Sequence, residues 1–137
     1  LWVYSADCAP ILIADKNNGH VAACHSGWRG IAKKVIKKSI SMMRNTGSRR
    51  KDLIIAIGPA ISGSNYQVEL EVVEAIANSL KEEDAFTLST TKQAIQSLKS
   101  NGIFKECNDS SRILLDIRSA ALYQLTQKNN LSLTLMN

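Results

Sequence analysis

Three short stretches of this sequence contain residue types that packing alone does not require. They are Asp7-Cys8, the run His-Ser-Gly-Trp-Arg-Gly at residues 25–30, and a loop rich in turn residues at 58–66. Cysteine and histidine are common ligands of Zn²⁺, and a Cys–His pair can also serve as nucleophile and base. The sequence therefore predicts either a metal site or thiol chemistry.

The distance in space between Cys8 and His25 depends on a predicted β-hairpin. Apolar runs at 11–14 and 21–24 flank the turn residues 15–19, which is typical of two antiparallel strands. If residues 16–19 form the loop, Asp15 lies opposite His20 and Cys8 lies opposite Gly27. His25 then shares a face with Cys8 as its diagonal neighbour, at a Cβ separation of about 7 Å. A turn centred on residues 18–19 would move the pair out of register.

The Cys8–His25 pair admits three interpretations. Both side chains can reach one Zn²⁺, whose typical bonds to sulfur and nitrogen are about 2.3 Å and about 2.0 Å. A catalytic zinc usually has three protein ligands, so a third would come from elsewhere. Alternatively, Cys8 acts as a metal-free thiolate nucleophile with His25 as its base, or both are ordinary core residues. Because side chains alternate along a strand, His20 and Cys24 are expected on the face of the hairpin opposite His25, away from this pair.

The segment that follows His25 leads from a strand into a predicted helix. Its backbone amides then point toward any anion at the helix N-terminus, where Gly27 and Gly30 permit close approach. Arg29 offers a planar fork to phosphate or carboxylate. The ordinary alternative is a helix cap made by Ser26, and Trp28 is interpreted as a packing residue or pocket wall.

The loop at 58–66 is a candidate second wall of the same pocket. Ligands of α/β proteins bind in loops at the ends of strands, and Asn65 and Tyr66 can bond or stack with a base or sugar. A plain connection is the alternative.

The remaining pattern predicts the elements that position these residues. Apolar spacing predicts a helix over 30–46 that stops at Gly47, and a buried strand over 53–57. Further helices are predicted over 72–80, 91–100 and 113–127, with a last strand over 131–136. Strands and helices alternate without repeats, which favours one α/β domain with a mixed sheet and packed helices.

Composition limits the function classes. The chain has 137 residues, 45% hydrophobic and 21% charged, with a net charge of +5, as expected of one globular domain. The basic excess between residues 33 and 51 is interpreted as a solvated helix face, and aromatic residues are not interleaved with it, so no nucleic-acid partner is expected.

Three cysteines without a disulfide spacing favour a reducing, cytoplasmic setting. No apolar run reaches the length of a membrane span. Both ends are apolar, so truncation at both ends is expected.

Taken in order, these motifs resemble the YfiH-like family, also described as the multicopper polyphenol oxidase or laccase-domain family. The matching residues are Asp7-Cys8, the 25–30 run, Ile-Gly-Pro-Ala-Ile at 57–61 and Tyr-Gln-Val at 66–68. The resemblance implies a single YfiH-like domain over 1–137 that lacks an N-terminal histidine segment and a C-terminal segment. It also implies cytosolic, zinc-dependent purine nucleoside phosphorylases that act on adenosine, inosine, guanosine or methylthioadenosine and can deaminate adenosine.

The resemblance also implies roles for individual residues. The family's zinc is held by His, Cys and His, of which the Cys matches Cys8 and the second His matches His25. We expect Cys8, His25, Asp7 and Arg29 to be catalytic, and inorganic phosphate and nucleoside to meet the following residues: Ser26, Gly27, Arg29, Asn65 and Tyr66. Residues 62–65 depart from the family pattern, which affects substrate preference. Copper-dependent phenol oxidation, a thiol hydrolase and a non-catalytic metal-binding module are the alternatives.

Overall fold

The two apolar runs around the first turn form the predicted hairpin. In the computed structural model, which describes residues 1–81 and 90–126, β1 (Ala9–Asp15) pairs antiparallel with β2 (Val21–Ser26). Ile11 lies opposite Cys24, and the Asp15 amide donates to the His20 carbonyl at 2.8 Å. This register confirms the loop at 16–19 and rules out the shifted turn.

A third strand completes the first sheet. β3 (Leu53–Ile57), at the predicted position, pairs antiparallel with β1, so the strand order is β2-β1-β3. Alternate residues of β1 and β3 are fully or almost fully buried: Ile11, Ile13, Leu53, Ile55 and Ile57. Burying each such side chain is worth about 1.5–3 kcal/mol, so this face anchors β1, which follows Cys8, against its neighbours, including β2, which carries His25.

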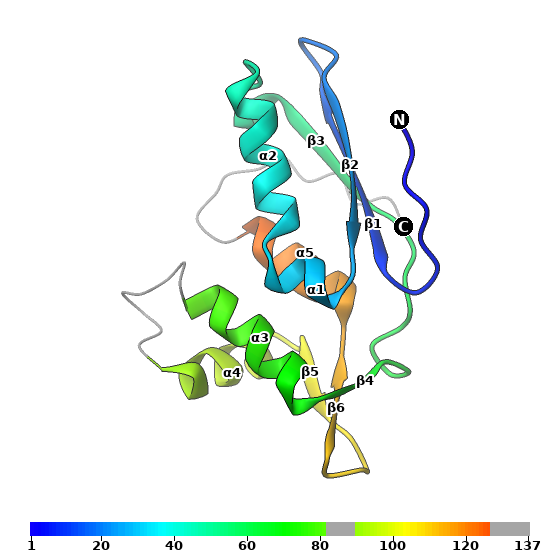
Figure 1. Ribbon diagram of the computed structural model, residues 1–137, viewed down its shortest axis with the longest axis vertical. Helices are drawn as coiled ribbons and strands as arrows, with labels where there is room; N and C mark the ends of the chain where they lie inside the picture. Colours follow the sequence, from blue (N-terminus) through cyan, green and yellow to red (C-terminus); the bar gives the residue numbers. More distant parts are fainter. Residues whose placement is uncertain (82–89, 127–137) are drawn as a thin grey trace.

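The predicted single helix over 30–46 is wrong, because the structure has two helices there. α1 (Trp28–Ala32) and α2 (Val35–Asn45) are separated by Lys34, whose backbone is left-handed with φ 59°. Apolar spacing continues through the break, so periodicity alone does not reveal it. Gly47, with φ 100°, follows the end of α2 as predicted. Figure 1 shows α2 lying along β2.

The second sheet differs most from the prediction. β4 (Gln67–Glu69), β5 (Phe104–Glu106) and β6 (Arg112–Leu115) form an antiparallel sheet in the order β4-β6-β5. The predicted helix over 113–127 is therefore wrong in its first residues, since α5 (Ile117–Thr126) begins after β6. The α/β class is confirmed, with two antiparallel sheets in place of one mixed sheet. The strand predicted over 131–136 lies outside the described residues.

Two further helices agree with the sequence. α3 (Leu70–Lys81) and α4 (Thr91–Ser100) pack against each other beside the second sheet (Figure 1). Thr90 caps α4 by accepting from the Gln93 amide at 3.2 Å, and the Gln93 side chain bonds back to the Thr90 amide. None of the described helices combines the length and apolar character needed to cross a membrane.

A candidate zinc and phosphate site at the end of the hairpin

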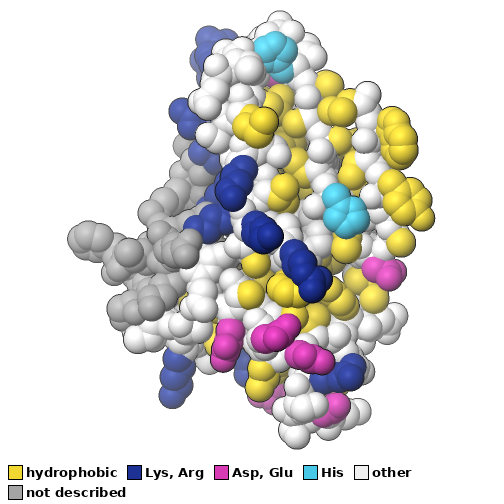
Figure 2. All heavy atoms as spheres, viewed as in Figure 1, with side chains coloured by type: hydrophobic (Ala, Val, Ile, Leu, Met, Phe, Trp, Pro, Cys, Tyr) yellow, Lys and Arg dark blue, Asp and Glu magenta, His cyan; other side chains and the backbone are white. Residues whose placement is uncertain are grey.

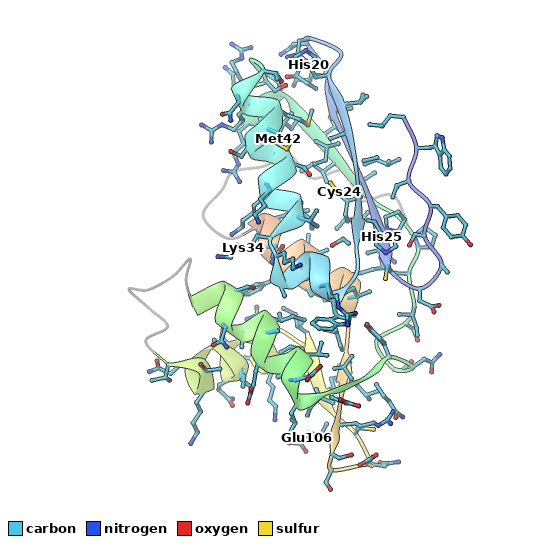
Figure 3. The ribbon with its side chains drawn as sticks, in the orientation of Figure 1. His20, Cys24, His25, Lys34, Met42 and Glu106 are labelled. Carbon is cyan, nitrogen blue, oxygen red and sulfur yellow. The ribbon has the colours of Figure 1, made fainter. Side chains whose placement is uncertain are left out.

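Cys8 and His25 meet around Gly27. A Cβ built on Gly27 would lie 2.7 Å from Cys8 Sγ and 3.8 Å from His25 Nε2. The sulfur and the imidazole nitrogen therefore border one small space, which stays open because residue 27 has no side chain. Cys24 is buried on the opposite face, where its thiol contacts Ser39 Oγ at 3.0 Å. Figure 3 shows His20 and His25 at opposite ends of β2.

The tautomer of His25 suits it to bind a metal. Its Nδ1 lies 3.0 Å from the Tyr4 carbonyl oxygen, and a carbonyl only accepts hydrogen bonds. Nδ1 is therefore the ring nitrogen that donates to this carbonyl, and Nε2 is the ring nitrogen that borders the space beside Gly27. A metal-bound histidine commonly has its other ring nitrogen fixed in this way. Sequence reasoning missed Tyr4, because a main-chain carbonyl leaves no signature in residue type.

The donor set fits two of the ligands of a zinc ion. A thiolate sulfur and an imidazole nitrogen are typical Zn²⁺ ligands, and here both face the same space. Among residues 1–81 and 90–126, no group of three His, Cys, Asp or Glu side chains is placed to hold a metal. If Cys8 and His25 hold a metal, a further ligand must come from outside the described residues.

The loop at 58–66 packs against the segment that carries Cys8. The Ile61 amide donates to the Asp7 carbonyl at 2.9 Å, and the Gly58 amide donates to the Pro10 carbonyl at 2.9 Å. A Cβ on Gly58 would lie only 2.7 Å from Pro10 Cγ, so glycine is needed for this close approach. These contacts hold the loop at the Cys8 end of the hairpin.

Tyr66 lies within the electrostatic reach of three of the predicted site residues. Burial raises the pKa of the Tyr66 phenol, and the charges of Cys8 and Asp7 raise it further, while Arg29 lowers it. The Tyr66 carbonyl accepts from the Leu115 amide at 2.9 Å, which fixes this residue at the start of the second sheet. Tyr66 therefore presents a neutral hydroxyl near the Cys8–His25 pair.

Arg29 is exposed and partly fixed by its neighbour. Its guanidinium carbon lies 4.2 Å from the centre of the Trp28 ring, so the indole supports one face of the cation. Within residues 1–81 and 90–126, no ion pair involves the edge of the guanidinium, which can therefore bind an anion. Because α1 has only five residues, its dipole adds little to this site and the positive charge comes mainly from Arg29.

Two predicted residues do not join the cluster. Ser26 is fully buried on the face opposite His25, and its hydroxyl neither caps α1 nor has another hydrogen-bond partner in the described part of the chain. Asn65 is exposed, and its amide N–H donates to the Ser62 carbonyl at 3.0 Å. Among the described residues, no hydrogen bond links either side chain to Cys8 or His25.

The chain is similar to proteins named purine nucleoside phosphorylases. The purine nucleoside phosphorylase of Synechocystis is 44% identical over 81 residues, which are 59% of this chain and 31% of that protein. The purine nucleoside phosphorylase of Aquifex aeolicus is 32% identical over 104 residues, covering 75% of this chain and 48% of that protein. The chain thus spans less than half the length of these two relatives.

Solved structures share the fold. A Neisseria meningitidis protein of the DUF152 family is 26% identical with a TM-score of 0.70, over 96% of this chain and 45% of its own. The Bacillus licheniformis protein YfiH matches with a TM-score of 0.72 at 23% identity. This match covers 97% of the present chain and 45% of the YfiH chain. The family described as multi-copper polyphenol oxidoreductase laccase matches residues 1–130. The chain therefore belongs to this family, and its fold is YfiH-like.

Proposed function

We propose that this chain contributes the Cys8–His25 part of a zinc-dependent purine nucleoside phosphorylase centre. The observation that supports the proposal is the space beside Gly27, which is bordered by the Cys8 thiol and by the metal-ready Nε2 of His25. Similarity to proteins named purine nucleoside phosphorylases agrees with it. The proposal assigns the remaining zinc ligand to a histidine outside this chain.

The reaction is the transfer of a pentosyl group from a purine to inorganic phosphate. A phosphate oxygen forms a bond to C1′ of the sugar while the bond from C1′ to N9 breaks, and the purine leaves with a proton. Zinc supplies Lewis-acid stabilisation of negative charge when bound. Arg29 and the Gly27 amide hold the phosphate, and Asp7 orients a ligand or moves the proton. The Tyr66 hydroxyl, kept neutral by burial and by its charged neighbours, donates to the nucleoside.

The proposed substrates are adenosine, inosine, guanosine and methylthioadenosine, with deamination of adenosine as a second activity. In deamination, water adds to C6 of the purine and ammonia leaves. Residues 62–65 (Ser-Gly-Ser-Asn) lie in the loop held against Asp7, so they are the part of this chain best placed to set the preference among purines.

The same residues allow other functions. Cys8 Sγ and His25 Nε2 both border the space beside Gly27, so a metal-independent thiol hydrolase with Cys8 as nucleophile and His25 as base is an alternative. Copper-dependent oxidation of phenols agrees less well, because one cysteine and one histidine do not build a multicopper cluster. A non-catalytic metal-binding module is the remaining candidate.

The test compares Cys8→Ala with Cys24→Ala, a matched cysteine on the opposite face of the hairpin. Both substitutions are made in a protein that also contains the proposed third ligand, and zinc content and hypoxanthine release from inosine are measured with phosphate present and omitted. We expect zinc and phosphate-dependent release in the wild type and in Cys24→Ala, and loss of both in Cys8→Ala. Release without metal, blocked by alkylation of Cys8, would instead support the thiol hydrolase. Zinc binding without any turnover would support the non-catalytic module.

A further inference from the structure

The C-terminal end of α2 carries a second, positively charged hollow. It has a volume of about 780 Å³ and is lined by Arg44, Arg49 and Arg50 together with small and polar residues, which are Ser41, Asn45, Gly47 and Ser48. In Figure 2, Lys and Arg side chains gather over α2 and its ends. The hollow lies at the end of α2 away from α1, so it is separate from the Cys8–His25 site (Figure 1).

Two of the three arginines in this hollow have no counter-charge among the described residues. Arg49 Nε lies 2.6 Å from Asp52 Oδ2, so the carboxylate next to the hollow is already paired. Neither Arg44 nor Arg50 forms an ion pair with any residue in the described ranges. Burial lowers the pKa of Arg50, and the positive charge of Arg44 lowers it further. The two guanidinium groups therefore repel each other across the hollow.

Arg50 also has an unsatisfied donor. Its Nε atom is buried and has no hydrogen-bond partner in the described part of the structure. An unpaired buried donor costs about 1–3 kcal/mol, and more when the group is charged. An acceptor placed in the hollow would remove this cost and the repulsion between Arg44 and Arg50 together.

Part of the nearby backbone is already paired. Two carbonyls near the end of α2 accept from the amides that follow the helix: Thr46 donates to Met42, and Ser48 donates to Met43 at 3.0 Å. The Ser48 hydroxyl accepts from Asn18 Nδ2 at 3.2 Å. None of the described residues that line the hollow is acidic, so its charge comes from the arginines.

We propose that Arg44 and Arg50 form a binding site for a phosphate-class dianion. Two uncompensated guanidinium groups match a charge of −2, and each planar fork can bond two oxygens of a tetrahedral anion. Ser41, on the exposed face of α2, adds a hydroxyl donor at the rim. The ligand is either free phosphate or the phosphate group of a small phosphomonoester.

The test follows the Nε–H signal of Arg50 by ¹H–¹⁵N NMR of the 137-residue chain, assigned with Arg50→Gln, during titration with inorganic phosphate. We expect a saturable shift in the wild type and in Lys51→Gln, which removes the same charge from an exposed residue outside the hollow. Arg44→Gln, which changes an exposed side chain, should weaken binding at least tenfold. An Arg50 signal that does not move, or that moves equally in Arg44→Gln, would overturn the proposal.

Two further arms identify the ligand and separate this site from the catalytic one. Arg29→Gln should leave the Arg50 titration unchanged, whatever it does to phosphorolysis, and loss of the Arg50 shift in that variant would contradict a separate site. Tighter binding of glycerol 3-phosphate than of inorganic phosphate would assign the site to phosphomonoesters. The reverse order would assign it to free phosphate.

Discussion

Gly27 is the residue on which the candidate metal site depends, because any side chain there enters the space between the two ligands. In Gly27→Ala, the new Cβ would lie 2.7 Å from Cys8 Sγ, inside normal contact distance, so the thiol must move. We expect zinc affinity to fall at least tenfold, as measured against a chromophoric chelator. Urea unfolding serves as the control for misfolding. Unchanged zinc affinity would mean that Cys8 and His25 do not share a metal ion.

The substitution Ser26→Ala tests whether the buried Ser26 hydroxyl binds phosphate. Because Ser26 Oγ has no partner in the described structure, Ser26→Ala should leave the free energy of unfolding unchanged or raise it by up to about 1 kcal/mol. Ser48→Ala is the matched control, since Ser48 is also buried but bonds Asn18, and it should cost about 1 kcal/mol. Loss of phosphorolysis in Ser26→Ala with stability intact would restore the phosphate-binding role predicted from its sequence position.

At the level of elements, the hairpin could be predicted from sequence and the helix break could not. Turn residues between two apolar runs define a loop length, and the loop length defines which residues face each other. The sequence therefore predicted that Cys8 and His25 are neighbours. The break at Lys34 has no such signal, because apolar residues keep their spacing on both sides of it. β4 and β5 have three residues each, too few to show an alternation.

The break between α1 and α2 carries backbone strain that can be measured. A left-handed conformation at a non-glycine residue costs about 1 kcal/mol, so Lys34→Gly should raise the free energy of unfolding by up to that amount. Lys33→Gly is the matched control, because Lys33 has φ −90° and glycine gains nothing there. We expect this control to destabilise the protein in urea. Equal effects of the two substitutions would contradict strain at Lys34.

The turn of the hairpin should make stability depend on acid. The Asn17 amide donates to Asp15 Oδ1 at 2.8 Å, and this bond, with others from Ser48 and Asn18, holds the pKa of Asp15 below 3.8. A lowered folded-state pKa gives stability that is present above the unfolded value and lost as the pH falls through the folded one. We therefore expect the melting temperature of wild type to exceed that of Asp15→Asn at pH 6, with the gap closing below pH 3.8. A gap independent of pH would show that the carboxylate charge is not involved.

On the scale of the whole molecule, the loop at 58–66 connects the two sheets. The sequence indicated the loop residues but did not predict that they make this connection. Its composition indicated a turn-rich segment near a site. Its contacts with Pro10 on one sheet and Leu115 on the other depend on chain pairing across more than forty residues. Local patterns do not encode such long-range contacts, which is also why the second sheet was not predicted.

Gly63 lies close to Asp116, which connects β6 to α5. A Cβ on residue 63 would lie 2.8 Å from Asp116 Cβ and 3.1 Å from its Cα, so Gly63→Ala must push the loop away from the backbone between β6 and α5. Overpacking of this kind costs about 1–3 kcal/mol, which urea unfolding would measure. Because Tyr66 lies three residues further along, KM for the nucleoside should also rise. Ser64→Ala, at an exposed neighbour whose hydroxyl bonds that of Ser62, should change stability by less than about 0.5 kcal/mol. If Gly63→Ala behaved like Ser64→Ala in both measurements, the loop would not be the connection that holds Tyr66 at the site.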